Sequence, residues 1–319
     1  MSPPPPPPLG RARKRDAQLF DPALCDTELV DVRAQFTQGR WAKVRALLTA
    51  TGDDWDRRGH RLVVLGQTPA ATAWAREWLL AEPDSADALT LLACAAVFDA
   101  LRRKGSPEAA DQACRRAAAL LPADPTPWLA LLLLTRTYGS EEEFSRHFDQ
   151  VRARHREHHH AHHLMVAKLA ERTPATGHDP LHEVYDFAAW AAEESPADSP
   201  LAVLPVIAHA ERYRVLATRH GSTFNSTGSA AQHWSGRRAR QVLRTAFDWW
   251  LEWEREDHPR NRVDLNFLAH AKLCEGRPAE AAALFHRIGR HATRAPWSYP
   301  DLDPHKAFLA ARSAALGSA

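Results

Sequence analysis

The chain has 319 residues, of which 45% are hydrophobic and 25% are charged, so it is long enough to bury a sizeable core. Its 41 basic and 39 acidic residues leave a formal charge of only +2, which provides no long-range field for holding a nucleic acid. Isoleucine occurs only at Ile207 and Ile288, and apolar residues recur at the helix period, so helices rather than strands are expected. The longest apolar run, from Trp128 to Leu134, is too short to cross a membrane.

Residues 1–20 have the composition of a disordered tail. Prolines run from Pro3 to Pro8, and a mostly basic stretch follows from Arg11 to Arg15. Proline runs favour an extended polyproline II conformation that buries nothing. No apolar segment follows the basic residues, so the pattern does not indicate a secretion signal, and we expect a cytoplasmic protein.

The rest of the chain repeats itself with a period of about 34 residues. Small residues such as Gly59 and Ala71 let two helices cross closely, and a large residue such as Trp55 fills the space between them. Pro83 marks the end of that unit, because proline cannot continue a helix. The clearest repeats span 52–85, 86–124, 125–158 and 262–295, and less regular helix pairs are expected over 26–51, 159–198 and 199–260, with a capping helix over 304–316. One unit cannot bury its apolar face alone, so we expect residues 21–319 to stack as a single domain.

These residue types and spacings resemble the tetratricopeptide repeat (TPR) signature. The resemblance implies an all-α fold, a right-handed superhelix of antiparallel helix pairs, with about six to seven pairs plus the capping helix. Gly66 and Gly276 stand where that signature ends its first helix, and we expect them to adopt the left-handed conformation. The phrases Asp54–Arg58 and Asp124–Trp128 are also similar to uncharacterised bacterial TPR-like proteins.

The resemblance further implies a concave groove that is lined by the first helix of each pair. The groove positions carried over to this chain are Asp56, His60, Phe98, Leu129, Leu133, Arg136, His163, Ile207, Asn266 and His270. This set is apolar in its middle and polar at its ends, and a groove filled only by water would not normally collect such apolar residues. We therefore expect a non-catalytic scaffold, without a cofactor, that binds a protein or peptide partner as an extended segment or an amphipathic helix. Tight stacking of facing units, which would bury these residues against each other, is the alternative.

A run of histidines from His158 to His163 is the main competing feature. His158 and His162, and likewise His159 and His163, stand at the i,i+4 spacing that places two imidazoles on one face of a helix. Such a pair can chelate a metal ion, but a zinc site normally needs a third or fourth ligand, and the sequence around the run offers no cysteine and no HExxH pattern. We expect a partly solvated polar helix start without a bound metal, and a metal-dependent enzyme or metal-binding protein is the alternative.

Regulatory nucleic acid binding is a weaker alternative. It would depend on the arginines between Arg237 and Arg244. The same helical segment continues into acidic residues from Asp248 to Asp257, which cancel that charge. A nucleic acid partner is therefore not expected.

Overall fold

The computed structural model describes residues 19–173, 182–221, 229–253 and 257–317. Within these residues the chain forms 17 α-helices and one short 3-10 helix, and it contains no strand. The predicted all-α class is confirmed. None of the helices in these ranges combines the length and the apolar character that crossing a bilayer would require. The predicted tail lies outside the described residues, except for Leu19 and Phe20.

The first half of the molecule is a succession of helices that are joined by short connections. These helices are α2 (Thr27–Phe36), α3 (Trp41–Thr51), α4 (Trp55–Gly66), α5 (Ala71–Ala81), α6 (Ala86–Leu101), α7 (Pro107–Leu120), α8 (Thr126–Tyr138) and α9 (Glu141–Arg154). Two of them fall inside each of the units expected over 52–85, 86–124 and 125–158.

The second half is less regular. It comprises α10 (His159–Ala170), α11 (Glu183–Glu193), η2 (Pro200–Val203), α12 (Leu204–His220), α14 (Ser229–Ser235), α15 (Arg237–Trp253), α16 (Asn261–Cys274), α17 (Pro278–Ile288), α18 (Arg294–Trp297) and α19 (Pro304–Gly317). The unit expected over 262–295 coincides with α16 and α17, and the expected capping helix coincides with α19.

Local chemistry explains where several helices begin. Asp54, Ser85 and Ser106 each precede a helix and accept a hydrogen bond from a backbone N–H in its first turn. Ser140 and Glu143 form a reciprocal capping box at the start of α9. These caps satisfy N–H groups that have no partner inside the helix, which places each start at the residue that the sequence indicates.

The glycines at the expected ends of the first helices, Gly66 and Gly276, are required for two different physical reasons. Gly276 has a φ of 81°, so the expected left-handed conformation is confirmed there. The same expectation is wrong for Gly66, which is the last residue of α4 and does not have a positive φ. A Cβ atom at Gly66 would lie 2.9 Å from Cβ of Cys94 and 3.0 Å from its carbonyl carbon. Gly66 is therefore required because α4 approaches the backbone of α6 closely.

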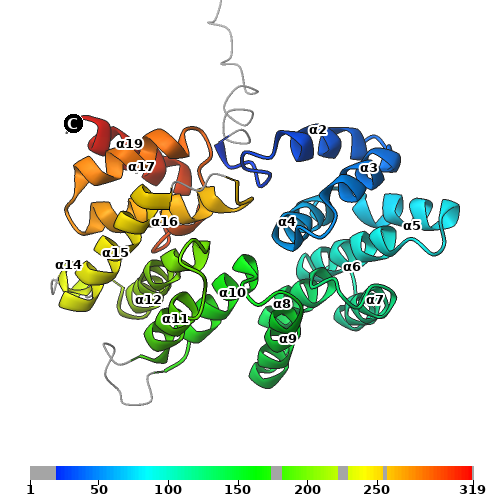
Figure 1. The fold of residues 1–319 in the computed structure, drawn as a ribbon, viewed down its shortest axis with the longest axis horizontal. Helices are drawn as coiled ribbons and strands as arrows, with labels where there is room; N and C mark the ends of the chain where they lie inside the picture. Colours follow the sequence, from blue (N-terminus) through cyan, green and yellow to red (C-terminus); the bar gives the residue numbers. More distant parts are fainter. Residues whose placement is uncertain (1–18, 174–181, 222–228, 254–256, 318–319) are drawn as a thin grey trace, which may run out of the picture.

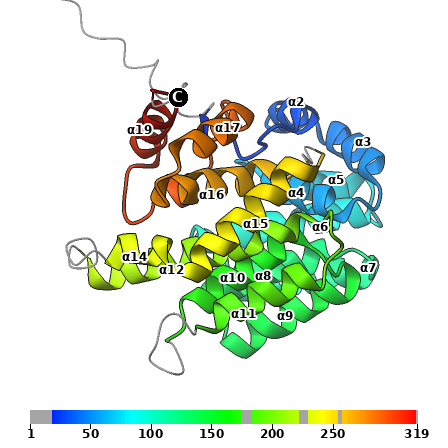
Figure 2. The ribbon, with the colours of Figure 1, turned by 60° about the vertical axis from the view of Figure 1, so that its left-hand side comes forward.

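Two hydrophobic cores meet at α8. One core comprises α2 to α8, the other extends from α8 to the C-terminal helices, and Trp128 and Leu133 pack against both. The chain also returns to its beginning, and the first described residues lie next to the C-terminal helices (Figures 1 and 2). Phe20 contacts the ring of His305 edge-on at 6.4 Å, and Arg57 donates a hydrogen bond of 2.6 Å to the carbonyl oxygen of Asp257. The succession of helices is thus closed upon itself.

Candidate functional site

A cavity of about 670 Å³ lies where the two halves of the chain face each other. Its walls come from the segment after Leu19, from α4, α6, α8, α10, α12 and α16, and from the segment between α17 and α18. Six of the ten groove positions expected from the sequence line it: His60, Phe98, Leu133, Arg136, His163 and Ile207. The closed chain therefore gathers most of these residues around one cavity, which is partly open to solvent.

The other four expected groove residues lie elsewhere. Leu129 and Asn266 are completely buried, and Asn266 binds the indole N–H of Trp297 at 2.7 Å, so both belong to the core. His270 lies among the aromatic rings of the C-terminal core, where burial lowers its pKa to about 4. Asp56 belongs to a histidine cluster next to the cavity. The tight stacking that the sequence left open as an alternative explains the burial of Leu129 and Asn266.

Two arginines of the cavity wall differ in their partners. Arg136 forms an ion pair of 2.9 Å with Glu171, so its charge is already compensated. Arg260 has no carboxylate within ion-pair distance among the described residues, and its Nε has no hydrogen-bond partner there. Burial lowers the pKa of Arg260 to about 10, although Asp264 and Asp56 oppose the shift. Arg260 is therefore an enclosed positive charge of this cavity that lacks a direct ion pair among the described residues.

The histidine run is buried, and the expected solvated helix start is wrong. His158, His159, His162 and His163 are between 0% and 9% exposed. Burial lowers the pKa of His159 to about 3 and that of His158 to about 4, so both imidazoles are neutral near pH 7. The physical reason is tertiary: the start of α10 is enclosed by α4 on one side and by α16 on the other.

Asp56 on α4 organises one side of this cluster. Its carboxylate accepts hydrogen bonds from Nε2 of His155 at 2.8 Å and from the backbone N–H of His159 at 3.0 Å. Nδ1 of His158 lies 3.6 Å from the same carboxylate, and Nε2 of His258 lies 3.5 Å from it. Burial alone would raise the pKa of Asp56, but these histidines outweigh it and hold the pKa well below its usual value.

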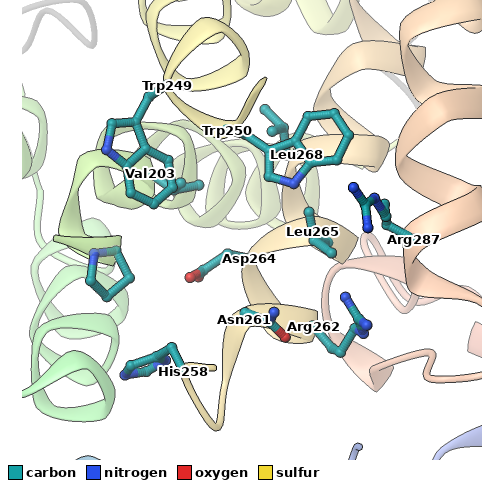
Figure 3. Close-up of a pocket in the computed structure, with 11 residues that line it drawn as sticks. Val203, Trp249, Trp250, His258, Asn261, Arg262, Asp264, Leu265, Leu268 and Arg287 are labelled. Carbon is teal, nitrogen blue, oxygen red and sulfur yellow. The ribbon is translucent and has the colours of Figure 1, made fainter. Parts of the chain in front are cut away.

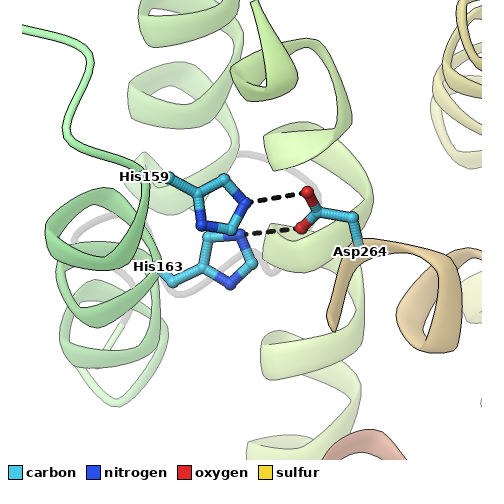
Figure 4. Close-up of side chains that lie close together, drawn as sticks. All are labelled: His159, His163 and Asp264. Carbon is cyan, nitrogen blue, oxygen red and sulfur yellow. Dashed lines mark hydrogen bonds and ion pairs between the residues drawn. The ribbon is translucent and has the colours of Figure 1, made fainter. Parts of the chain in front are cut away.

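Asp264 on α16 organises the other side (Figure 4). One carboxylate oxygen lies 2.8 Å from Nε2 of His159, and the other lies 3.1 Å from Nε2 of His163. Burial opposes ionisation of Asp264, yet the two histidines keep its pKa well below the usual range. The rings of His159 and His258 lie 4.7 Å apart and join the two sides of the cluster.

The three groups at Asp264 have the composition of a metal site. His159, His163 and Asp264 each offer one ligand atom, and these atoms lie within 4.8 Å of one another. Two imidazoles and one carboxylate form a common ligand set for zinc and for iron. A second, small cavity of about 30 Å³ reaches Asp264 and His258 from the side of Trp249 and Trp250 (Figure 3), and its size suffices for a water molecule.

Sequence reasoning found the histidines but missed Asp264 and His258. The hydrogen bond between His159 and Asp264 joins residues that are 105 positions apart. No local spacing can indicate such a partner. The one available signal is an aspartate at the start of an otherwise apolar helix, which is also what a solvated helix end looks like.

Comparison of the chain with protein-family models, with curated proteins and with solved structures gives no match.

Proposed function

We propose that this chain is a TPR-like cytoplasmic binding protein that holds part of an extended peptide from a partner protein in its central cavity and does not itself catalyse a reaction. The observation that carries the proposal is the cavity of about 670 Å³, which is lined by apolar and polar residues and contains a cation, Arg260, without an ion-pair partner among the described residues. Repeating pairs of helices, stacked in chain order, support the TPR-like part of the proposal.

The size of the cavity fits a segment of a few residues. Ligand pockets of about 300–1,000 Å³ hold small molecules or a few residues, and the cavity of about 670 Å³ lies within that range. An amphipathic helix, which the sequence left open, stays an alternative.

The chemistry of the walls suggests what that segment contains. Phe98 and Leu133 offer an apolar surface, whereas Ile207 is 1% exposed behind them, and Arg260 offers a guanidinium whose burial is not offset by a direct ion pair. A buried charge is costly unless it is paired. An ion pair between a ligand carboxylate and Arg260 would therefore be stronger than the same pair in water. The proposed ligand thus presents apolar side chains next to an acidic group.

The test is capture of partners from native lysate, followed by mass spectrometry and by affinity measurement with the captured protein. Leu133→Asp should weaken binding by at least an order of magnitude, which is about 1.4 kcal/mol, because it places a charge in the apolar wall. Leu80→Asp is the matched control, since Leu80 is 85% exposed and lies on the outside. Circular dichroism and a melt establish that both variants are folded.

Normal binding by a folded Leu133→Asp variant would show that the partner uses another surface. Leu133 packs against both cores, so the substitution could also unfold the chain. Arg260→Met then serves instead, because it removes the charge and keeps most of the length of the side chain. Unchanged affinity in that variant would equally contradict the proposal.

A metal-dependent enzyme is the second candidate function. It is favoured by one specific observation, the grouping of His159, His163 and Asp264 at the edge of the cavity.

A further inference from the structure

We propose that His159, His163 and Asp264 bind one divalent transition-metal ion, with zinc as the first candidate. This inference goes beyond the proposed peptide binding and does not depend on it. Three independent features support it: the directions of the ligand atoms, the charge of the enclosed carboxylate, and the two cavities that reach the site.

The ligand atoms converge. His159 and His163 are one helical turn apart on α10, and both Nε2 atoms point at the carboxylate of Asp264 (Figure 4). Donors bound at about 2.0–2.1 Å to one tetrahedral ion stand roughly 3.3 Å apart. The observed separations of 2.8 Å and 3.1 Å run to the two different oxygens of Asp264, and the ligand atoms of the three groups lie within 4.8 Å of one another, so movements of the side chains would bring them around an ion.

Binding through Nε2 would move the proton of His159 to Nδ1. In the structure, Nε2 of His159 is within hydrogen-bond distance of Asp264, and a metal bound at Nε2 requires that nitrogen to be unprotonated. The other ring nitrogen, Nδ1, is buried and has no hydrogen-bond partner among the described residues. A neutral imidazole can carry its proton on Nδ1 and bind the ion through Nε2, at the cost of a buried N–H without a protein acceptor.

The carboxylate of Asp264 has no direct ion pair with an arginine or a lysine among the described residues, although Arg260 acts on it at longer range. It is 6% exposed, and its hydrogen-bond partners are the imidazoles of His159 and His163. Asp56, a second enclosed carboxylate, contacts His155, His158 and the backbone N–H of His159. Burial of a carboxylate is costly without compensation, and a divalent cation coordinated by Asp264 would supply it directly.

The site is open to exchangeable ligands on two sides. His163 lines the cavity of about 670 Å³, and Asp264 lines the small cavity of about 30 Å³. Structural zinc sites are usually closed by four protein ligands, whereas sites with three protein ligands keep a position for water or for another molecule. We therefore place this ion among those with an open position, next to the space that the proposed peptide would occupy.

The experiment uses the full chain, purified without an affinity metal and treated with a chelator. Titration with Zn²⁺ in a calorimeter should give one equivalent of tight binding, and Co²⁺ should give a visible absorption band. Asp264→Asn is nearly isosteric and should weaken Zn²⁺ binding by ~100-fold or more, because it removes the charged ligand. His163→Ala should weaken Zn²⁺ binding to a similar extent, because it removes one of the two imidazole ligands.

The matched control is His155→Gln, which removes a neighbouring imidazole that binds Asp56 instead of Asp264. It should leave the affinity for Zn²⁺ within about threefold, because the three proposed ligands remain. The proposal fails if wild-type protein binds no Zn²⁺, or if folded Asp264→Asn binds it as tightly as wild type. Weak binding to histidines at the surface would persist in all three variants and would likewise overturn the proposal.

X-ray absorption of the zinc-loaded wild-type protein is the second measurement, and it needs no variant. Scattering from two imidazoles and from light oxygen ligands is expected. A sulfur ligand, or fewer than two imidazoles, would assign the ion to another place. Since no peptide is present in these experiments, their outcome is independent of the proposed partner binding.

Discussion

Arg58 on α4 connects three parts of the chain through buried ion pairs. Its Nε donates to Asp124 at 2.8 Å, and its Nη2 donates to Asp87 at 2.5 Å. Arg58 and Asp124 belong to the two phrases that stand out in the sequence, Asp54–Arg58 and Asp124–Trp128. The contact between them gives both phrases a structural role at the junction of α4, α6 and α8.

Asp124→Ala should lower the free energy of unfolding by about 3–5 kcal/mol, because it leaves Arg58 buried with one carboxylate fewer. It also removes the acceptor for the backbone N–H of Thr126. Asp111→Ala is the control, since it breaks an exposed i,i+4 pair with Arg115 that is worth less than ~1 kcal/mol. Urea denaturation measures both. Equal effects of the two substitutions would contradict the assignment of a buried network.

At the scale of elements, α8 holds the two cores together. Its apolar run is buried on several faces, which explains why it lacks the one-sided pattern of a surface helix. Trp128 packs against both cores, and the guanidinium of Arg154 lies 5.0 Å from its ring. Trp128 stands at the same repeat position as Trp55, where a large residue is expected to fill the space between two helices, and its partly buried packing agrees with that expectation.

Trp128→Ala should therefore cost about 3–5 kcal/mol, the range for a large aromatic side chain that is removed from a core. Trp253→Ala is the control of the same residue type, because Trp253 is 41% exposed at the end of α15. That change should cost less than ~1 kcal/mol. A thermal melt that is insensitive to Trp128→Ala would show that α8 does not join the cores in the way described.

At the scale of the whole molecule, burial of many histidines predicts a dependence of stability on pH. Burial lowers the pKa to about 3 or 4 for His60, His158, His159, His162, His209 and His270. The unfolded chain takes up protons near the ordinary histidine pKa of about 6.5, whereas the folded chain does not, so stability is full above that pH and falls as the pH drops below it. Below that pH, each such histidine lowers the free energy of unfolding by up to about 1.4 kcal/mol per pH unit.

Urea denaturation with a chelator present should show a loss of at least ~4 kcal/mol between pH 7.5 and pH 5.5. The carboxylates with lowered pKa, such as Asp56, contribute only at lower pH, so this window belongs to the histidines. His209→Phe removes one histidine outside the cluster and should reduce the loss of stability across this window by about 1.4 kcal/mol. Constant stability across the window would contradict the burial of these side chains.

The sequence by itself determined the features that depend on neighbours along the chain. Caps such as Ser106 and Ser140 and breakers such as Pro83 mark the ends of helices through contacts with their own first or last turn. The i,i+4 spacing places His159 and His163 on one face of α10, because the helix repeats every 3.6 residues. The expected groove positions are partly recovered for the same reason, since they mark one face of each helix.

Only the tertiary structure decided which other elements these helix faces contact. Closure of the chain depends on small rotations between successive helices, which add up over the whole molecule and leave no local mark in the sequence. This closure buries Leu129 and Asn266, yet it leaves Leu133 and Ile207 at the cavity. It also brings Asp56 and Asp264 to opposite sides of the histidine run, where long-range contact turns an apparently solvated helix start into an enclosed cluster of imidazoles and carboxylates.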